Sequence, residues 1–196
     1  MVKKNDIVSF LNKEKKCTEK ISEKHGDIKK IIDVLINARD KGNSIYVIGN
    51  GGSGSTASHF VSDLLKTAIL KNKNRFKAIS LVDNIPVMLA WSNDTSFVDI
   101  FEQQLVNYIH DGDVVIAFSG SGNSKNILKA LKYCSKSNVV SIGFSGSTGG
   151  KMKKLCTMCL TVPSTDMLLI ESSHVVICHC IISYIRNKGI PQFKYE

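Results

Sequence analysis

The sequence predicts an α/β fold with a five-stranded parallel sheet and helices on both faces. Short apolar runs alternate with helix-like stretches along the chain. These runs lack the polar alternation of a half-exposed strand, so both faces of each strand are expected to be buried. Two turns rich in serine and glycine follow such runs, at the sheet edge where open α/β sheets bind ligands. The 196 residues are expected to form one domain, residues 1–196, with a helical extension over about residues 1–42.

The first forty residues are predicted to form two helices. Ile7, Phe10 and Leu11 give one helical stripe, and a broader stripe covers residues 28–36. A stripe that broad is typical of a helix buried on more than one side, which hints at subunit contacts. The second helix is expected to end near Gly42.

The later elements follow the apolar and turn signals in order. Strands are expected at the apolar, largely β-branched runs of residues 45–48, 78–82, 113–118, 139–144 and 159–162. Pro86 fits the first turn of a short helix. Further helices are expected at residues 56–70, 98–108, 125–135 and, the longest, about 166–187.

Composition points to a cytoplasmic globular protein without a membrane partner. Apolar residues make up 43% and charged residues 22% of the chain, as in soluble domains. No uninterrupted apolar segment has the length of a membrane span, and no apolar stretch of a signal peptide follows the basic start, residues 1–6. The six cysteines, including the Cys156–Cys159 pair, are therefore expected to be reduced, mostly buried fillers.

The net charge of +9 raises the question of nucleic-acid binding. Nine lysines fall in the first thirty residues, but five acidic residues lie among them, as on a solvated helix surface. The sequence shows no aromatic interleaving and no known DNA-binding pattern. We therefore expect no nucleic-acid partner; the same charge would attract a phosphorylated sugar.

The first serine- and glycine-rich turn spans residues 49–56. It lacks the lysine of a P-loop. It matches G-x-G-x-x-G at Gly49, Gly51 and Gly54, but no acidic residue ends the next strand as a dinucleotide site requires. Serine hydroxyls suit a terminal monophosphate, which accepts hydrogen bonds on several oxygens.

The second turn, residues 119–124, repeats this chemistry. Each turn can present backbone N–H groups and hydroxyls at a helix N-terminus, and both are expected at the same sheet edge. They are therefore expected to hold one phosphate together. The alternative is that such turns only connect strand to helix, with Asn50 and Asn123 tolerating unusual backbone angles.

Two pairs of side chains are candidates for the chemistry. His59 and Asp63 are four residues apart and share one helix face, so they could form a metal site, an acid/base pair or a surface hydrogen bond of little consequence. Glu171 and His179 can border one cleft from the last helix, although His179 could also be a core histidine. His174 is expected to be a packing or interface residue.

The chain resembles the sugar isomerase (SIS) domain family, and within it the phosphoheptose isomerases, which convert sedoheptulose 7-phosphate to D-glycero-D-manno-heptose 7-phosphate. The resemblance runs over about residues 28–185. Five motifs carry it, in the order found in the family: Gly49-Asn50-Gly51-Gly52-Ser53, His59-Phe60-Val61-Ser62-Asp63-Leu64, Ser92-Asn93-Asp94, Ser119-Gly120-Ser121-Gly122-Asn123-Ser124 and Val162-Pro163-Ser164-Thr165-Asp166.

The resemblance implies a homotetramer with active sites at subunit boundaries and a sugar phosphate as substrate. Some members of the family hold a divalent metal; two histidines and two carboxylates suit zinc, and manganese or iron is also chemically plausible. The residues that the resemblance implies for phosphate are Ser53, Ser119, Ser121 and Ser124, and those for the metal are His59, Asp63, Glu171 and His179.

Aldose–ketose isomerisation moves a proton between adjacent carbons, and a carboxylate can remove it while a histidine relays protons to the sugar oxygens. We expect Asp63 to be the general base and His179 its acid/base partner. His59 and Glu171 are expected to bind the metal or orient the substrate. The full set expected to contact substrate or phosphate is Asn50, Gly51, Gly52, Ser53, Asn93, Asp94, Ser119, Gly120, Ser121, Ser124 and Glu171.

The chain departs from the family pattern at two positions. Many phosphoheptose isomerases carry Glu where this chain has Asp63, and Gln where it has Glu171. Asp is shorter, which leaves the assignment of the base open, while Glu171 adds charge that favours a divalent ion. Two other functions stay open: an isomerase of another sugar phosphate, and a non-catalytic SIS-type phosphosugar-binding or replication-adaptor protein, against which the retained carboxylate and His179 argue.

Overall fold

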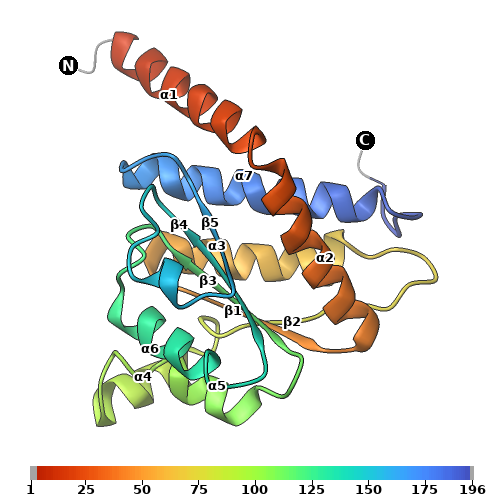
Figure 1. Cartoon of the computed structure of the whole chain (residues 1–196), viewed down its shortest axis with the longest axis vertical. Helices are drawn as coiled ribbons and strands as arrows, with labels where there is room; N and C mark the ends of the chain where they lie inside the picture. The colour runs from red at the N-terminus through yellow and green to blue at the C-terminus, as the bar shows by residue number, and fades with distance from the viewer. Residues whose placement is uncertain (1–3, 195–196) are drawn as a thin grey trace.

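Five parallel strands form one sheet in the order β2-β1-β3-β4-β5, as a computed structural model of residues 4–194 describes (Figure 1). This confirms the predicted α/β class. The residues 1–3 of the basic start lie outside the described residues. The strands are β1 Ser44–Gly49, β2 Lys77–Ser80, β3 Val114–Ser119, β4 Val140–Ser145 and β5 Met158–Thr161.

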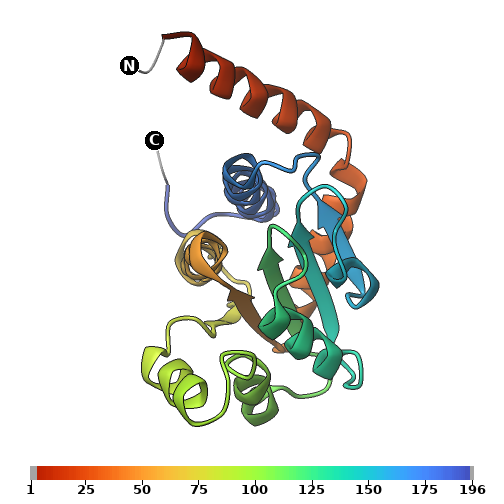
Figure 2. The same cartoon turned by 90° about the vertical axis from the view of Figure 1, so that its left-hand side faces the viewer.

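Helices cover both faces of the sheet (Figures 1 and 2). One side carries α1 Lys4–Ser22, α2 His25–Lys41, α3 Gly51–Ser62 with a π-helical turn η1 Asp63–Thr67, and α7 Met167–Arg186. The other side carries α4 Ile85–Asp94, α5 Glu102–Tyr108 and α6 Lys125–Cys134, and a short 3-10 turn, η2 Met152–Lys154, precedes β5.

The strands are apolar throughout because both of their faces are buried. In β3, Ile116 and Phe118 pack on the side of α2, α3 and α7, whereas Val115 and Ala117 pack on the side of α5 and α6. All four are fully buried. Alternating side chains thus supply two separate cores, as a sheet between two helical layers requires.

Helix α3 starts five residues earlier than predicted, at Gly51 rather than Thr56. Glycine disfavours a helix interior. Here the missing side chain of glycine lets the end of β1 approach the first turn of α3 closely. A Cβ on Gly49 would collide with the backbone of Ser53. The glycine-rich turn is therefore the first turn of the helix itself.

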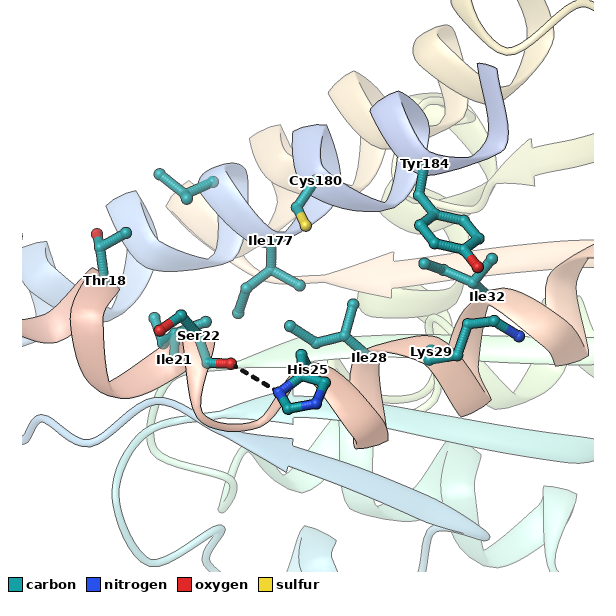
Figure 3. Close-up of a pocket in the computed structure, with 11 residues that line it drawn as sticks. Thr18, Ile21, Ser22, His25, Ile28, Lys29, Ile32, Ile177, Cys180 and Tyr184 are labelled. Atoms are coloured by element: carbon teal, nitrogen blue, oxygen red, sulfur yellow. Dashed lines mark hydrogen bonds between the residues drawn. The ribbon is translucent and has the colours of Figure 1, made fainter. Parts of the chain in front are cut away.

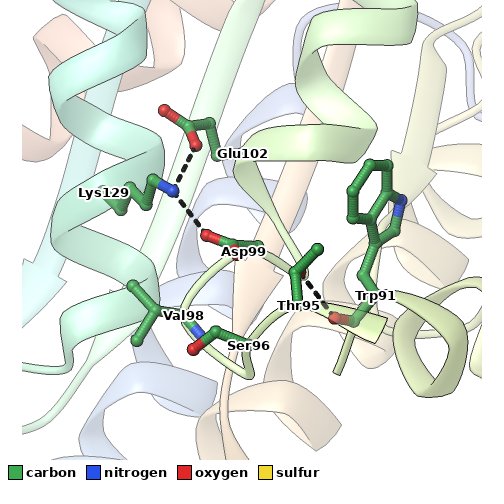
Figure 4. Close-up of polar contacts among 7 residues, drawn as sticks. All are labelled: Trp91, Thr95, Ser96, Val98, Asp99, Glu102 and Lys129. Carbon is green, nitrogen blue, oxygen red and sulfur yellow. Dashed lines mark hydrogen bonds and ion pairs between the residues drawn. The ribbon is translucent and has the colours of Figure 1, made fainter. Parts of the chain in front are cut away.

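Helix α5 starts at Glu102, four residues later than predicted. The preceding residues form a turn in which the Ser96 hydroxyl accepts a hydrogen bond from the Val98 N–H at 3.1 Å. Asp99 and Glu102 both pair with Lys129 of α6, Glu102 at 3.0 Å (Figure 4). The hydrogen bond from the Val98 backbone to the Ser96 side chain competes with helix formation at these residues. The other strands and helices lie within about two residues of their predicted bounds.

Helix α7 is long and apolar enough to cross a membrane by composition alone, but half of its most apolar window is buried inside the molecule. It packs against α1, α2 and α3. Its start agrees with the prediction, because Asp166 accepts a hydrogen bond from the Leu168 N–H at 3.0 Å and caps the helix.

Candidate active site

The two serine-rich turns flank the point where the strand order reverses. β1 lies between β2 and β3, so successive connections run in opposite directions from this pair of strands. Open sheets of this order bind ligands at that reversal, beyond the carboxyl ends of the strands. The first turn follows β1 and the second follows β3, so both border the expected ligand crevice.

The first turn places its polar groups at the N-terminus of α3. Gly51 has a φ of +53°, a left-handed conformation that favours glycine. The Ser53 side chain is buried, whereas Gly51 and Gly52 are exposed. Asn50 has an extended backbone rather than an unusual one.

A pair of amides ties the two turns together. Asn50 Nδ2 donates to Asn126 Oδ1 at 2.9 Å, and Asn126 Nδ2 donates to Asn50 Oδ1 at 2.8 Å. Asn126 lies at the start of α6, just after the second turn, and is buried. Sequence reasoning missed Asn126, whose only signal was a polar residue at the start of an otherwise apolar helix face. Asn50 therefore joins the turns through its side chain.

The second turn gathers hydroxyls at the N-terminus of α6. Ser119 and Ser124 have their Oγ atoms 3.4 Å apart, and Ser124 is the residue that precedes the helix. Ser121 Oγ accepts a hydrogen bond from the Asn123 N–H at 3.1 Å. Ser119 is buried and Ser121 is exposed, so the turn offers hydroxyls both in its interior and at its surface.

A third turn, residues 145–151 after β4, supports the second and was not predicted. The Lys151 N–H donates to Asn123 Oδ1 at 3.1 Å, and the Met152 N–H donates to the Gly122 carbonyl at 2.9 Å. The Gly146 N–H donates to the Gly120 carbonyl at 2.8 Å. The run Ser-Gly-Ser-Thr-Gly-Gly at residues 145–150 was the available signal.

Helices α3 and α7 lie side by side and bring three candidate residues together (Figures 1 and 2). His59 Nε2 and His179 Nε2 are 2.8 Å apart. Asp63 Oδ2 lies 3.5 Å from His59 Nε2 and 3.7 Å from His179 Nε2. The side chains of His59 and His179 are 47% and 57% exposed, so they are surface residues rather than core residues in the single chain.

Glu171 lies outside this group, at the N-terminus of α3. A Cβ added to Gly52 would collide with the Glu171 carboxylate, so the two residues are in close approach. A helix N-terminus favours a negative charge. In the described part of the chain, only His59, Asp63 and His179 form a group whose ligand atoms lie within 4.8 Å of one another.

The three-residue group fits a divalent ion. Ligand atoms around a tetrahedral zinc are about 3.3 Å apart, given Zn–N distances of about 2.0 Å. The observed separations of 2.8, 3.5 and 3.7 Å bracket that value. Two imidazoles and a carboxylate are ligands that zinc accepts while leaving a position open to substrate.

Asn93 and Asp94 lie at the end of α4, on the opposite side of the sheet from α3 and α7. Both are exposed, and Asn93 Nδ2 donates to Asp94 Oδ1 at 2.8 Å. Among the residues that the structure describes, no hydrogen bond joins this pair to either serine-rich turn. The structure does not bring them to the histidine–aspartate group within one chain.

His174 packs in the core, as expected. Its ring lies 5.6 Å from the Phe118 ring and 6.2 Å from the Phe144 ring. Burial lowers the pKa of His174 to about 4, and the nearby Ser145 backbone opposes that shift. In the described structure, neither ring nitrogen makes a hydrogen bond of normal geometry. His174 is therefore a neutral packing residue.

Comparison with known proteins adds the family to this geometry. The model of the SIS domain family matches residues 9–146 of the chain. The chain belongs to the SIS domain family. A phosphoheptose isomerase of Aneurinibacillus thermoaerophilus is 34% identical over 168 residues, which cover 83% of this chain and 84% of the relative. Phosphoheptose isomerase 2 of Campylobacter jejuni is 36% identical over 154 residues, which cover 79% and 76%.

Solved structures of SIS proteins agree with the fold. A phosphoheptose isomerase from Francisella tularensis has a TM-score of 0.89 at 25% identity, over 95% of this chain and all of the other. One from Neisseria gonorrhoeae has a TM-score of 0.87 at 21% identity, over 93% and 98%. The similarity extends over nearly the whole chain, including the helices that carry the histidine–aspartate group.

Proposed function

We propose that the protein is an aldose–ketose isomerase that converts sedoheptulose 7-phosphate to D-glycero-D-manno-heptose 7-phosphate. The observation that carries this proposal is the convergence of two imidazoles and one carboxylate within 4.8 Å, on helices that begin beside the phosphate-type turns. Relatives that bear the name phosphoheptose isomerase support the substrate class.

The phosphate end of the sugar is proposed to bind at the two serine-rich turns. Ser53, Ser119, Ser121 and Ser124 supply hydroxyls, and residues 50–52 and Gly120 supply backbone groups at the starts of α3 and α6. Helix N-termini stabilise an anion there. The Glu171 carboxylate, which lies beside Gly52, would have to turn toward the sugar when the phosphate binds, because two anions at one helix start repel.

Proton transfer is assigned to the group between α3 and α7. The Asp63 carboxylate removes the carbon-bound proton next to the carbonyl, which yields an enediolate. His179 then exchanges protons with the sugar oxygens, and His59 holds the carboxylate in place. A divalent ion would be held by His59, Asp63 and His179, a ligand set that suits zinc, and would supply Lewis-acid polarisation of the carbonyl.

The remaining candidate residues lie away from this group. Glu171 would complete the set of ligands only after moving toward the group. Asn93 and Asp94 remain assigned to sugar hydroxyls.

Self-association, expected as a homotetramer with active sites at subunit boundaries, is part of the proposal. Helix α1 projects from the body, and its Ile7 and Leu11 side chains are about 60% exposed (Figures 1 and 2). An apolar groove of about 500 Å³ lies between α7 on one side and the end of α1 and α2 on the other, lined by residues such as Ile21, Ile28 and Ile177 (Figure 3). Burying both surfaces would favour association.

A cytoplasmic location is also proposed. All six cysteines are free thiols in the structure, and three of them are buried. Burial raises the pKa of Cys134 and of Cys156 to about 12. Such thiols are inert fillers, which suits a reducing compartment.

The test is turnover of purified protein with sedoheptulose 7-phosphate, followed as the aldose product. EDTA should abolish turnover and added Zn²⁺ should restore it. Unchanged turnover in EDTA would contradict the metal requirement alone. No turnover with any divalent ion, together with tight sugar-phosphate binding, would instead support a non-catalytic SIS protein. Greater turnover of a pentose or hexose phosphate would change the substrate.

A further inference from the structure

The helix that carries His59 changes its winding at Asp63. Residues Asp63–Thr67 form a π-helical turn, in which the Ala68 N–H donates to the Asp63 carbonyl at 2.8 Å, five residues back. Such turns inside or after an α-helix occur often at functional sites, because they redirect side chains. This one begins at the residue proposed as the general base.

The π-helical turn places a hydroxyl on the Asp63 carboxylate. Thr67 Oγ1 donates to Asp63 Oδ1 at 2.9 Å. The other carboxylate oxygen, Oδ2, is the one that lies near the imidazole nitrogens of His59 and His179. The two oxygens therefore have separate partners, and the hydroxyl fixes the rotation of the carboxylate about its last bond.

Thr67 is itself held from the neighbouring helix. Arg186 Nη1 donates to the Thr67 carbonyl at 2.9 Å, which satisfies a backbone group left without a helical partner at the helix end. Arg186 lies two turns beyond His179 on α7. The contact thus fixes Thr67 relative to the same helix that supplies His179.

We propose that Thr67 is a positioning residue that orients Asp63 so that Oδ2 faces His59 and His179. This inference rests on the proposed function, because it assigns Asp63 its reactive oxygen. The hydroxyl selects which oxygen of the aspartate faces the imidazoles, because Oδ1 is already engaged. Without the hydroxyl, Oδ1 and Oδ2 could exchange places, and the carboxylate would be ordered for neither metal nor substrate.

Three variants separate the hydroxyl from the packing of the side chain. Thr67→Val removes the hydroxyl at constant shape, Thr67→Ala removes it without a branched side chain, and Thr67→Ser keeps it. Thr95→Val is the matched control, because Thr95 Oγ1 donates at 2.8 Å to the Trp91 carbonyl on the far side of the sheet (Figure 4). Zinc affinity is measured by competition with a chelating dye, together with kcat and KM.

Loss of a group that orients a metal ligand typically costs about 10–100-fold in metal affinity or activity. We expect Thr67→Val and Thr67→Ala to weaken Zn²⁺ binding and lower kcat by about that factor, with little change in KM. Thr67→Ser and Thr95→Val should stay close to the wild type. Thermal melts of all four variants identify any that fail to fold, and the alanine variant serves if the valine variant does so.

Crystal structures of the wild type and of Thr67→Val keep this inference distinct from the proposed function. If the wild type neither binds Zn²⁺ nor turns over, the proposed function fails, and the orientation of Asp63 in the two structures still decides the role of Thr67. Wild-type zinc affinity and kcat in Thr67→Val, or an Asp63 carboxylate with unchanged orientation, would overturn the inference. Equal losses in the serine and valine variants would also overturn it.

Discussion

At the scale of single residues, the site depends on which atoms face each other across the seam between α3 and α7. His59 and His179 present Nε2 atoms 2.8 Å apart, and Asp63 presents one oxygen to both. The two imidazoles are about half exposed, and the 15%-exposed Asp63 side chain lines a pocket together with His179, so a ligand can reach the group from solvent. Both an acid/base pair and a metal site would need the negative charge of the Asp63 carboxylate. Removing that charge therefore tests both.

Asp63→Asn and His179→Gln should each lower kcat by about 10²–10⁴-fold, because general acid–base catalysis contributes rate factors of that size. Both changes nearly conserve shape on a partly exposed seam, so thermal stability should change little. Asp33→Asn, on the exposed surface of α2 in an ion pair with Lys29, is the matched control and should keep the wild-type rate. Wild-type turnover in both site variants would refute the catalytic assignment.

At the scale of elements, the start of α3 is decided by glycines that allow close approach. A Cβ at Gly49 would meet the rigid backbone of Ser53, whereas a Cβ at Gly52 would meet the end of the flexible Glu171 side chain. The same substitution at these two positions should therefore have different effects. The clash at Gly52 can be relieved by rotation of the Glu171 side chain, whereas the clash at Gly49 requires α3 to move.

Gly49→Ala should lower the free energy of unfolding by about 1–3 kcal/mol, the typical cost of overpacking, and Gly52→Ala should cost less. Denaturant titrations measure both. In a Glu171→Ala background the cost of Gly52→Ala should fall further, because its clashing partner is gone, and a double-mutant cycle gives that coupling. A Gly52→Ala cost that is unchanged by Glu171→Ala would show that the carboxylate does not occupy this place.

At the scale of the whole molecule, a buried histidine makes stability depend on pH. Burial lowers the pKa of His174 to about 4, whereas the ring titrates near 6.5 in the unfolded chain. Between these values the unfolded chain binds more protons, so stability is fully present above about pH 6.5 and declines as the pH falls toward 4. The full loss attributable to this ring is about 3 kcal/mol, and it is reached only below about pH 4.

The variant His174→Phe should therefore lose less stability than the wild type between pH 7 and pH 4.5, since phenylalanine suits the aromatic surroundings and cannot take up a proton. Urea titrations across this range provide the measurement. The exposed His110→Gln variant serves as control and should follow the wild type. Parallel pH profiles for the wild type and His174→Phe would contradict the prediction.

The projecting helix α1 sets an expectation for assembly. Leu11→Asp places a charge on its exposed apolar stripe and should shift the proposed tetramer toward smaller species, as measured by light scattering after size-exclusion chromatography. Val106→Asp, on the exposed surface of α5, is the control and should leave assembly unchanged. A monomeric wild type, or a tetramer that survives Leu11→Asp, would argue against assembly through this stripe.

Local signals in the sequence were sufficient for much of the fold. The strands could be placed because short apolar runs rich in β-branched residues, such as residues 114–118, are too short for a helix and lack its amphipathic pattern. The early start of α3 could not be predicted, because it depends on how closely Gly49 approaches the Ser53 backbone in space. The late start of α5 accompanies the turn in which the Ser96 hydroxyl accepts from the Val98 N–H, a contact that competes with the helical alternative for the same residues.

The sequence by itself determined the parallel α/β architecture, the serine-rich turns and the residue types available for acid–base or metal chemistry. Spacing along one helix also placed His59 near Asp63, since residues four apart share a face. Only the tertiary structure brought His179 to that pair, kept Glu171 at the start of α3 and joined Asn50 to Asn126. Those contacts join residues up to 120 positions apart, and packing between helices and across the sheet, not local preference, decides such distances.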